Sequence, residues 1–295
     1  MAIDGILLLE KEAGMTSHTA VRRAARLFGA DKAGHTGTLD PMATGVLPVL
    51  LGRAVKASEY ITEGDKHYVA TLRLGLTTDT EDTTGATLTV SDALPREEDV
   101  QTALAAFRGA QTQVPPMYSA LKVGGQKLVD LARRGVTVER APREIFIYRL
   151  VAERLSESDY RLDVVCSKGT YIRTLCADIG AKLGCGGVMA SLTRVEAAGY
   201  PLSACRTLAA YEAMTEEERR ACVRPTETLF SELPRLYFPP FYARLAHNGQ
   251  AVSQRKLGGA YPVGERLRLS DDDGFFALGE ITGEGTVRPL KFFRL

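Results

Sequence analysis

The chain has 295 residues, of which 45% are hydrophobic and 25% charged, so it can bury the core of one large domain or of two unequal ones. Its net charge of +1 does not by itself indicate a nucleic-acid-binding protein. No apolar run approaches the length of a membrane span, the N-terminus lacks the basic start of a signal peptide, and none of the five cysteines forms a C-x-x-C pair, so we expect a cytoplasmic protein with buried, reduced cysteines.

Apolar spacing and turn residues predict the elements of the first half of the chain. An apolar stripe between an N-cap at Thr16 or Ser17 and a C-terminal Gly29 is typical of a helix. Short runs rich in Val and Leu are typical of strands. The predicted elements are a strand at Gly5–Leu9, a helix ending at Gly29, strands at 46–52 and Tyr68–Leu74, and a helix at Glu97–Phe107.

The second half predicts an insertion, a strand pair, a helix and a small β domain. Residues 109–141 interrupt the core pattern with Gly, Pro and basic residues. In the predicted helix the apolar residues recur at spacings of three and four, and Arg173 lies off this stripe. The predicted elements are strands at Ile145–Leu155 and Tyr160–Cys166, a helix at Gly169–Gly184, a charged helix within 209–233, and short strands from Leu236 onward.

The near-neutral total hides an uneven distribution of charge. Residues 108–149 contain eight Lys and Arg against three acids, whereas residues 78–99 contain seven acids against one Arg. Residues 235–295 have nine basic residues against six acids. A basic face that meets phosphates would give this pattern, although a charge run is also typical of any solvated face.

Residues 34–45, GHTGTLDPMATG, form what we call the signature loop, and they hold a single carboxylate, Asp40. Three glycines, three threonines and Pro41 restrict or tie the backbone around it, as expected of a segment that fixes one side chain in place. The alternative is a polar turn whose aspartate caps a neighbouring helix.

The signature loop resembles that of the TruB family of tRNA pseudouridine synthases, whose catalytic aspartate stands in G-H-x-G-T-L-D-P. Three further blocks are similar to that family's and occur in its order, which makes chance resemblance very improbable. They are KHYVATLRLGLTTDTED at 66–82, matching K-x-Y and L-G-x-x-T-D-T-x-D; QVPPMYSALK at 113–122; and SKGTYIRTLCADIG at 167–180.

This resemblance implies a fold and a domain organisation. We expect an α/β (α+β) pseudouridine synthase fold: a mixed, largely antiparallel central sheet with flanking helices and a thumb-like insertion at about 109–141. The catalytic domain is expected to cover residues 1–232. Residues 236–295 resemble, more weakly, a small β-barrel RNA-binding domain of the PUA type.

The resemblance also implies the reaction, the isomerisation of uridine-55 in the T-loop of tRNA to pseudouridine by base flipping. Asp40 is the expected catalytic residue, and Arg173 its ion-pair partner, which would keep it charged and oriented. Tyr68 would stack on the target base, and Leu192 would line the base pocket. Since the isomerisation needs no redox step and no energy input, and no metal or nucleotide motif is visible, we expect no cofactor and no metal site.

Several residues are expected to bind RNA. His35 resembles a histidine that fills the stacking space of the flipped base. Arg133 and Arg134 lie in the basic insertion. Lys56, Lys168 and Tyr171 match family positions at or near the pocket. Two departures from the family, Val129 for Tyr and Thr193 for the first Arg of L-R-R, affect the details of RNA contact and leave the three central residues intact.

Two other functions stay open at this point. A guide-RNA-dependent synthase of the archaeal and eukaryotic type would share the aspartate loop but usually lacks the insertion. An RNA-folding factor would not need Asp40 for its activity. We therefore expect the T-arm of tRNA as partner, with no guide RNA, no membrane and no obligatory protein partner.

Overall fold

The computed structural model describes residues 3–61 and 64–294. A nine-stranded sheet forms its centre, with the strand order β1-β3-β12-β4-β11-β10-β7; β2 pairs with β3, and β13 pairs with β12. All pairs are antiparallel except β3 with β12, so the expected mixed, largely antiparallel sheet is confirmed. The strands are β1 (Gly5–Lys11), β2 (Ala33–His35), β3 (Thr44–Leu51), β4 (Lys66–Leu74), β7 (Gly109–Gln113), β10 (Arg143–Arg154), β11 (Asp159–Cys166), β12 (Gly187–Ala197) and β13 (Tyr200–Pro201).

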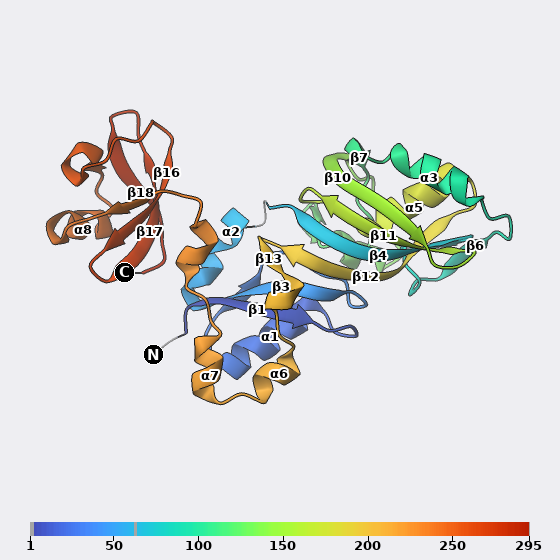
Figure 1. The fold of residues 1–295 in the computed structure, drawn as a ribbon, viewed down its shortest axis with the longest axis horizontal. Helices are drawn as coiled ribbons and strands as arrows, with labels where there is room; N and C mark the ends of the chain where they lie inside the picture. Colours follow the sequence, from blue (N-terminus) through green and yellow to red (C-terminus); the bar gives the residue numbers. More distant parts are fainter. Residues whose placement is uncertain (1–2, 62–63, 295) are drawn as a thin grey trace.

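Helices α1, α3 and α5 share one apolar cluster with the central sheet, whereas η1 packs on the opposite face of β1 and β3. In Figure 1, α3 and α5 lie behind the half of the sheet that contains β10 and β11, and α1 lies beside β1 with α6 and α7. The helices of this part are α1 (Ser17–Phe28), α2 (Ser58–Ile61), α3 (Glu97–Ala105), α5 (Ile172–Leu183), α6 (Leu208–Glu212) and α7 (Glu216–Ala221), with 3-10 turns η1 (Gly52–Ala57), η2 (Leu202–Ala204) and η3 (Thr226–Phe230). Within the described residues, no helix has the length and apolar character needed to cross a membrane.

The helix signals in the sequence act as predicted at α1 and less fully at α5. Thr16 accepts a hydrogen bond from the N–H of Thr19, and Gly29 takes the left-handed conformation, so both predicted caps of α1 are confirmed. The α5 helix begins at Ile172 and not at Gly169, because Gly169 has a φ of +81° and Tyr171 is extended. Residues 167–171 therefore form a turn that precedes the helix.

The insertion is shorter than predicted. Gly109–Gln113 forms β7, which pairs with β10 and is the edge strand of the central sheet. Residues 114–142 leave the sheet and carry a small hairpin, β8 (Lys122–Val123) and β9 (Gln126–Lys127), followed by α4 (Leu128–Ala132). A second excursion, β5 (Leu76–Thr78) and β6 (Thr87–Val90), follows β4 and contains the acidic turn of residues 79–82.

The C-terminal part is a sheet of five strands and not the closed barrel that the resemblance implied. The strand order is β14-β16-β17-β18-β15, and the two end strands do not pair with each other in the described residues. Its own apolar cluster includes Leu236, Phe238 and Phe276. The elements are β14 (Arg235–Tyr237), α8 (Pro240–His247), β15 (Val252–Ser253), η4 (Gln254–Leu257), β16 (Arg266–Asp271), β17 (Gly274–Ile281) and β18 (Thr286–Phe292).

Apolar and polar contacts join the C-terminal sheet to the β1–β3 end of the central sheet (Figure 1). Phe230 packs against Phe293 with ring centroids 5.6 Å apart. The Lys291 ammonium pairs with Glu59 at 2.6 Å, and the Lys56 ammonium donates to the Phe292 carbonyl at 3.0 Å. The two parts therefore share a continuous packed junction.

Candidate active site

Asp40 lies in the signature loop between β2 and β3, and contacts from two neighbouring elements fix the backbone beside it. The Ser17 hydroxyl at the start of α1 accepts from the Leu39 N–H at 2.8 Å and donates to the Leu39 carbonyl at 3.0 Å. The buried Lys11 ammonium at the end of β1 donates to the Ala43 carbonyl at 2.7 Å. The position of Asp40 is thus set by α1 and β1 as well as by the loop.

Arg173, the second residue of α5, holds the carboxylate of Asp40 with two hydrogen bonds. Its Nε donates to Asp40 Oδ2 at 2.9 Å and its Nη2 to Asp40 Oδ1 at 3.2 Å. The Arg173 side chain is 5% exposed, whereas that of Asp40 is 30% exposed. A two-pronged pair of this kind fixes the orientation of the carboxylate as well as its charge. The pair predicted from the sequence is present.

Two backbone carbonyls complete the surroundings of the Arg173 guanidinium. Its Nη1 donates to the Thr80 carbonyl at 3.1 Å, and its Nη2 donates also to the Tyr118 carbonyl at 2.7 Å. Thr80 belongs to the acidic turn after β5, and Tyr118 to the insertion. These contacts explain why a residue off the apolar stripe of α5 is nevertheless buried. They also make Arg173 the point where the signature loop, the acidic turn and the insertion meet.

The electrostatic balance at Asp40 differs from the one the ion pair alone would give. Burial raises the pKa of Asp40 above the ordinary 3.8, and this effect is larger than the opposing attraction of Arg173. Asp82 raises the pKa further, and Lys11 opposes it. The carboxylate is therefore held in an environment that makes it more basic than a solvated aspartate.

Tyr68 and Leu192 come from adjacent strands, and both belong to the apolar cluster that also contains Leu39 of the signature loop. Tyr68 on β4 is 8% exposed and Leu192 on β12 is 7% exposed. Burial raises the pKa of the Tyr68 hydroxyl, so it remains protonated at neutral pH, while the nearby Arg194 opposes that shift. A neutral ring and an aliphatic side chain suit the binding of a flat, uncharged base.

His35 lies at the end of β2, in the signature loop, where it is half-buried. Burial lowers its pKa below 6.5, and the charge of Arg194 lowers it further. Its Nδ1 is buried and makes no hydrogen bond to the described residues. His35 is thus a neutral, planar ring at neutral pH, which favours stacking over phosphate binding.

Comparison with known proteins identifies the family. Residues 25–172 match "TruB family pseudouridylate synthase (N terminal domain)", and residues 173–231 match "tRNA pseudouridylate synthase B C-terminal domain". The chain is 43% identical over 291 residues to the tRNA pseudouridine synthase B of Aromatoleum aromaticum, which spans 98% of this chain and 92% of that protein. The chain belongs to the TruB family. It is therefore a pseudouridine synthase, an isomerase.

Other similar proteins agree with this assignment. The tRNA pseudouridine synthase B of Pseudomonas fluorescens is 41% identical over 297 residues, spanning 99% of this chain and 96% of the relative. Among solved structures, one titled "Crystal Structure of a Cbf5-Nop10-Gar1 Complex" aligns with a TM-score of 0.70 at 25% identity, covering 98% of this chain and 84% of that chain. Together with the TruB match, this likeness supports the predicted pseudouridine synthase fold.

The structure places the remaining predicted residues in several different parts of the fold. The backbone of Tyr171 is held by the side chain of Gln113, which accepts from its N–H at 2.8 Å and donates to its carbonyl at 3.0 Å. Lys168 is in the turn before Tyr171 and lines a hollow beside β7 and β10. Lys56 lies at the junction with the C-terminal sheet. Arg133 and Arg134 follow α4 in the insertion.

Two buried basic residues at the site were not predicted from the sequence. Lys11 is 1% exposed, and burial lowers its pKa to about 8. Arg194 is also 1% exposed, and it donates to the Val46 carbonyl at 2.8 Å and to the Gly37 carbonyl at 3.0 Å. Strand alternation could have found Arg194, because it lies two residues from Leu192 and so points to the same face. Lys11 has no comparable signal, since both faces of β1 are buried. No group of three or more potential metal-ligating side chains occurs within residues 3–61 and 64–294.

Proposed function

We propose that this enzyme converts uridine-55 in the T-loop of tRNA to pseudouridine, with Asp40 as its catalytic residue. The observation that carries the proposal is the ion pair between the partly exposed carboxylate of Asp40 and the buried guanidinium of Arg173. The relatives that match over nearly the full chain are named tRNA pseudouridine synthase B, which supports tRNA as the substrate.

The chemistry needs one well-placed carboxylate. The bond between uracil N1 and ribose C1′ breaks, the base turns, and its C5 bonds to the same C1′ while the C5 proton moves away and N1 gains one. Asp40 acts either as nucleophile or as stabiliser of the cationic ribose. The raised pKa of Asp40 fits both roles, because a desolvated carboxylate is a stronger nucleophile and is well suited to balance a nearby positive charge.

The groups around Asp40 fit a flipped base. Tyr68 and Leu192 offer apolar surface for a uracil ring, and neutral His35 can occupy the stack that the base leaves. Flipping costs a few kcal/mol of unstacking, less for a base already in a loop. A loop uridine is therefore a better substrate than a base-paired one.

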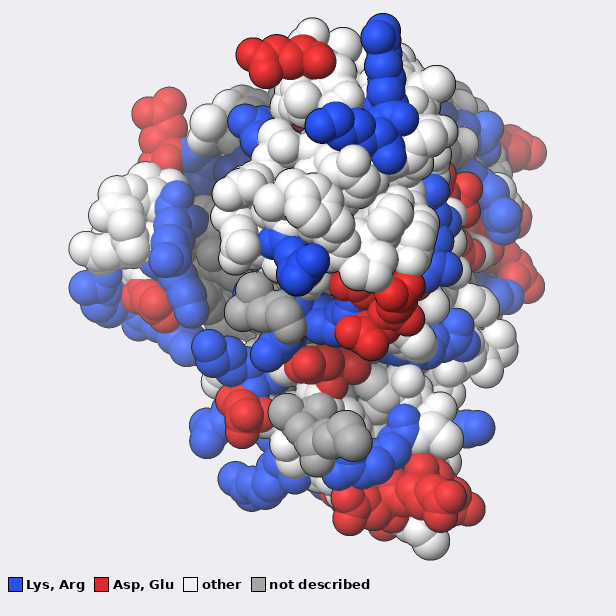
Figure 2. All heavy atoms as spheres, turned by 90° about the vertical axis from the view of Figure 1, so that its left-hand side faces the viewer, with Lys and Arg blue, Asp and Glu red and all other residues white. Residues whose placement is uncertain are grey.

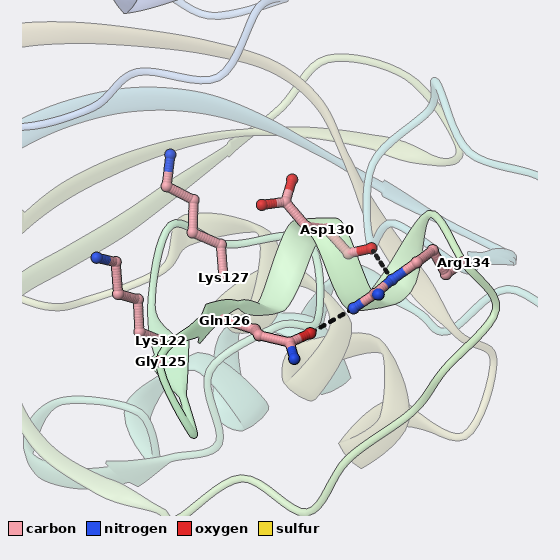
Figure 3. A pocket seen from close by; sticks show the side chains of 6 residues that line it. All are labelled: Lys122, Gly125, Gln126, Lys127, Asp130 and Arg134. Carbon is pink, nitrogen blue, oxygen red and sulfur yellow. Dashed lines mark hydrogen bonds between the residues drawn. The ribbon is translucent and has the colours of Figure 1, made fainter.

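The insertion supplies a basic surface for the RNA backbone. A hollow of about 540 Å³ is lined by Lys122, Lys127, Arg134, Asp130 and Gln126. Figure 3 shows the Lys122 and Lys127 side chains pointing away from Arg134, which donates to Gln126 and to the Asp130 carbonyl. We assign this surface and the neighbouring Arg133 to T-arm phosphates.

The C-terminal sheet is assigned a PUA-like role, holding the acceptor side of the tRNA. Figure 2 shows that the face of the molecule at this end has an uncharged centre surrounded by Lys and Arg, with acidic side chains among them. Such a mixed face fits weak positioning of an RNA helix better than tight binding.

The decisive experiment is incubation of the purified enzyme with unmodified tRNA transcripts and with a T-arm hairpin, followed by site-resolved detection of pseudouridine. We expect modification of position 55 in both RNAs without any added guide RNA. Modification of a different stem, or a requirement for a guide RNA, would contradict the proposed substrate while leaving the family unchanged.

Single-turnover activity should fall in acid at a pH set by Asp40. Because the pKa of Asp40 is raised, the fall should be centred above 3.8, with full activity on the alkaline side where the carboxylate is charged. Replacing Lys11 by Met removes a charge that lowers this pKa, so the acid limb should move to higher pH. A pH–rate profile of both proteins measures the shift, and an acid limb that moved to lower pH in the Lys11→Met variant would contradict the charge balance described here.

The salt dependence of tRNA binding should show whether the insertion contacts RNA phosphates. The double variant Lys122→Gln and Lys127→Gln should weaken binding and reduce the slope of log Kd against log salt by about 1 to 2, because each phosphate contact releases a counterion. Arg96→Gln, an exposed arginine already paired with Asp99 on α3, is the matched control. An unchanged slope in the lysine variant would show that the hairpin does not face RNA.

A further inference from the structure

Glu81 in the acidic turn is held in a conformation that non-glycine residues rarely adopt. Its φ is +62°, and of the described non-glycine residues only Ala198 also has a positive φ. Strain of this kind persists where the surroundings over-determine the backbone. Its own N–H donates to the Thr78 carbonyl at 3.3 Å, and its carbonyl accepts from the Met189 N–H at 3.0 Å. The turn is thereby anchored to β12.

The Glu81 side chain is directed at the helix that carries Arg173. Its Oε2 accepts from the hydroxyl of Thr174, the residue after Arg173, at 2.6 Å. Thr174 is 5% exposed. Burial raises the pKa of Glu81, while the hydrogen bond from Thr174 and the charge of Arg173 oppose that shift. A half-buried carboxylate is thus tied to the first turn of α5 next to the guanidinium.

The same turn supplies a direct partner of Arg173. The Thr80 carbonyl, one residue before Glu81, accepts from Arg173 Nη1 at 3.1 Å. Asp82, one residue after Glu81, holds the turn closed by accepting from the hydroxyls of Thr80 and Thr84 at 2.8 and 2.6 Å. The left-handed residue Glu81 therefore directly follows the carbonyl that accepts from Arg173, and its own carboxylate accepts from Thr174.

We propose that Glu81 is a positioning residue for the reaction. Through its contact with Thr174 and through the Thr80 carbonyl, it keeps the Arg173 guanidinium in the orientation that bonds both oxygens of Asp40. Glu81 acts through Thr174 and the Thr80 carbonyl, and it stands at the position that the T-D-T-x-D pattern leaves open. The inference rests on the proposed catalytic role of Asp40. It implies that loss of the Glu81–Thr174 contact lowers the rate of chemistry without weakening tRNA binding.

The test compares single-turnover rates at saturating tRNA transcript, tRNA affinity and thermal unfolding for a set of variants. Glu81→Gly accepts the positive φ without strain and removes the carboxylate, so it should fold at least as well as the parent. We expect its rate to fall about tenfold with affinity nearly unchanged, since a small displacement of a catalytic group is costly. Glu81→Gln, which keeps an oxygen acceptor for Thr174, should recover most of the rate.

Variants of Thr174 and a matched control complete the test. Thr174→Val should slow the reaction as Glu81→Gly does, Thr174→Ser should retain activity, and the double variant Glu81→Gly with Thr174→Val should be no slower than either single one. Ala198→Gly relieves the same backbone strain elsewhere, at the end of β12, and should leave the rate unchanged.

Two results would overturn the inference: a parental rate in folded Glu81→Gly protein, or independent, multiplying losses in the double variant. Asp40→Asn in the same assay separates the two proposals. If that variant is active, the proposed catalytic role of Asp40 fails. If it is inactive while Glu81→Gly is unaffected, only the role of Glu81 fails.

Discussion

Asp40→Asn is expected to abolish pseudouridine formation while leaving tRNA affinity within about threefold of the parent, because phosphate contacts supply most of the affinity. Asparagine can still accept from Arg173 but can neither attack ribose C1′ nor balance a cationic ribose, so the rate should fall by about four orders of magnitude or more. Single-turnover assays with enzyme in excess, together with filter binding of the same transcript, measure both quantities.

The matched control for this variant is Asp163→Asn. Asp163 is also bonded to a basic side chain, His67 at 2.9 Å, but it lies on β11 in a partly exposed cluster with His67 and Arg149. Its loss should leave turnover intact. Appreciable turnover by folded Asp40→Asn protein, in a preparation free of host enzyme, would remove Asp40 from the mechanism.

Most of the central sheet could be predicted because its strands and helices carry local signals. The caps of α1 stand at Thr16 and Gly29, and the strand pair β10 and β11 alternates around a polar turn, so each is specified by neighbouring residues. The start of α5 was predicted at Gly169, because residues 169–171 directly precede the apolar stripe in the sequence. The helix begins at Ile172, since Gly169 has a positive φ.

The rest depended on contacts between distant residues, which no local pattern encodes. The family resemblance paired Arg173 with Asp40, but the burial of Arg173 by the Thr80 and Tyr118 carbonyls arises only when three loops meet. The edge strand β7 was assigned to the insertion because its alternation is weak and polar. The predicted barrel of the C-terminal strands was not confirmed. Closure of a barrel depends on whether the two end strands pair, which the residues of each single strand do not encode.

Arg173→Lys is expected to lower the rate of chemistry by about two orders of magnitude, and Arg173→Met by about three, with tRNA affinity nearly unchanged. Lysine keeps the charge that opposes the rise in the pKa of Asp40, but a single ammonium cannot reproduce hydrogen bonds to both Asp40 oxygens, the Thr80 carbonyl and the Tyr118 carbonyl. Methionine also leaves Asp40 without its partner, so its acid limb should move to higher pH.

The control is Arg73→Lys, because Arg73 makes the same two-pronged contact with Asp159, through Nε and Nη2 at 2.8 Å each, on the exposed face of the sheet. That exchange should leave turnover unchanged, and it should alter the free energy of unfolding by no more than about 0.5 kcal/mol. Chemical denaturation of each variant shows whether the fold survives, since removing one partner of a buried ion pair costs about 3–5 kcal/mol. If Arg173→Lys matched the parent in rate, charge alone would suffice, and the fork geometry that joins the signature loop, the acidic turn and the insertion would have no part in catalysis.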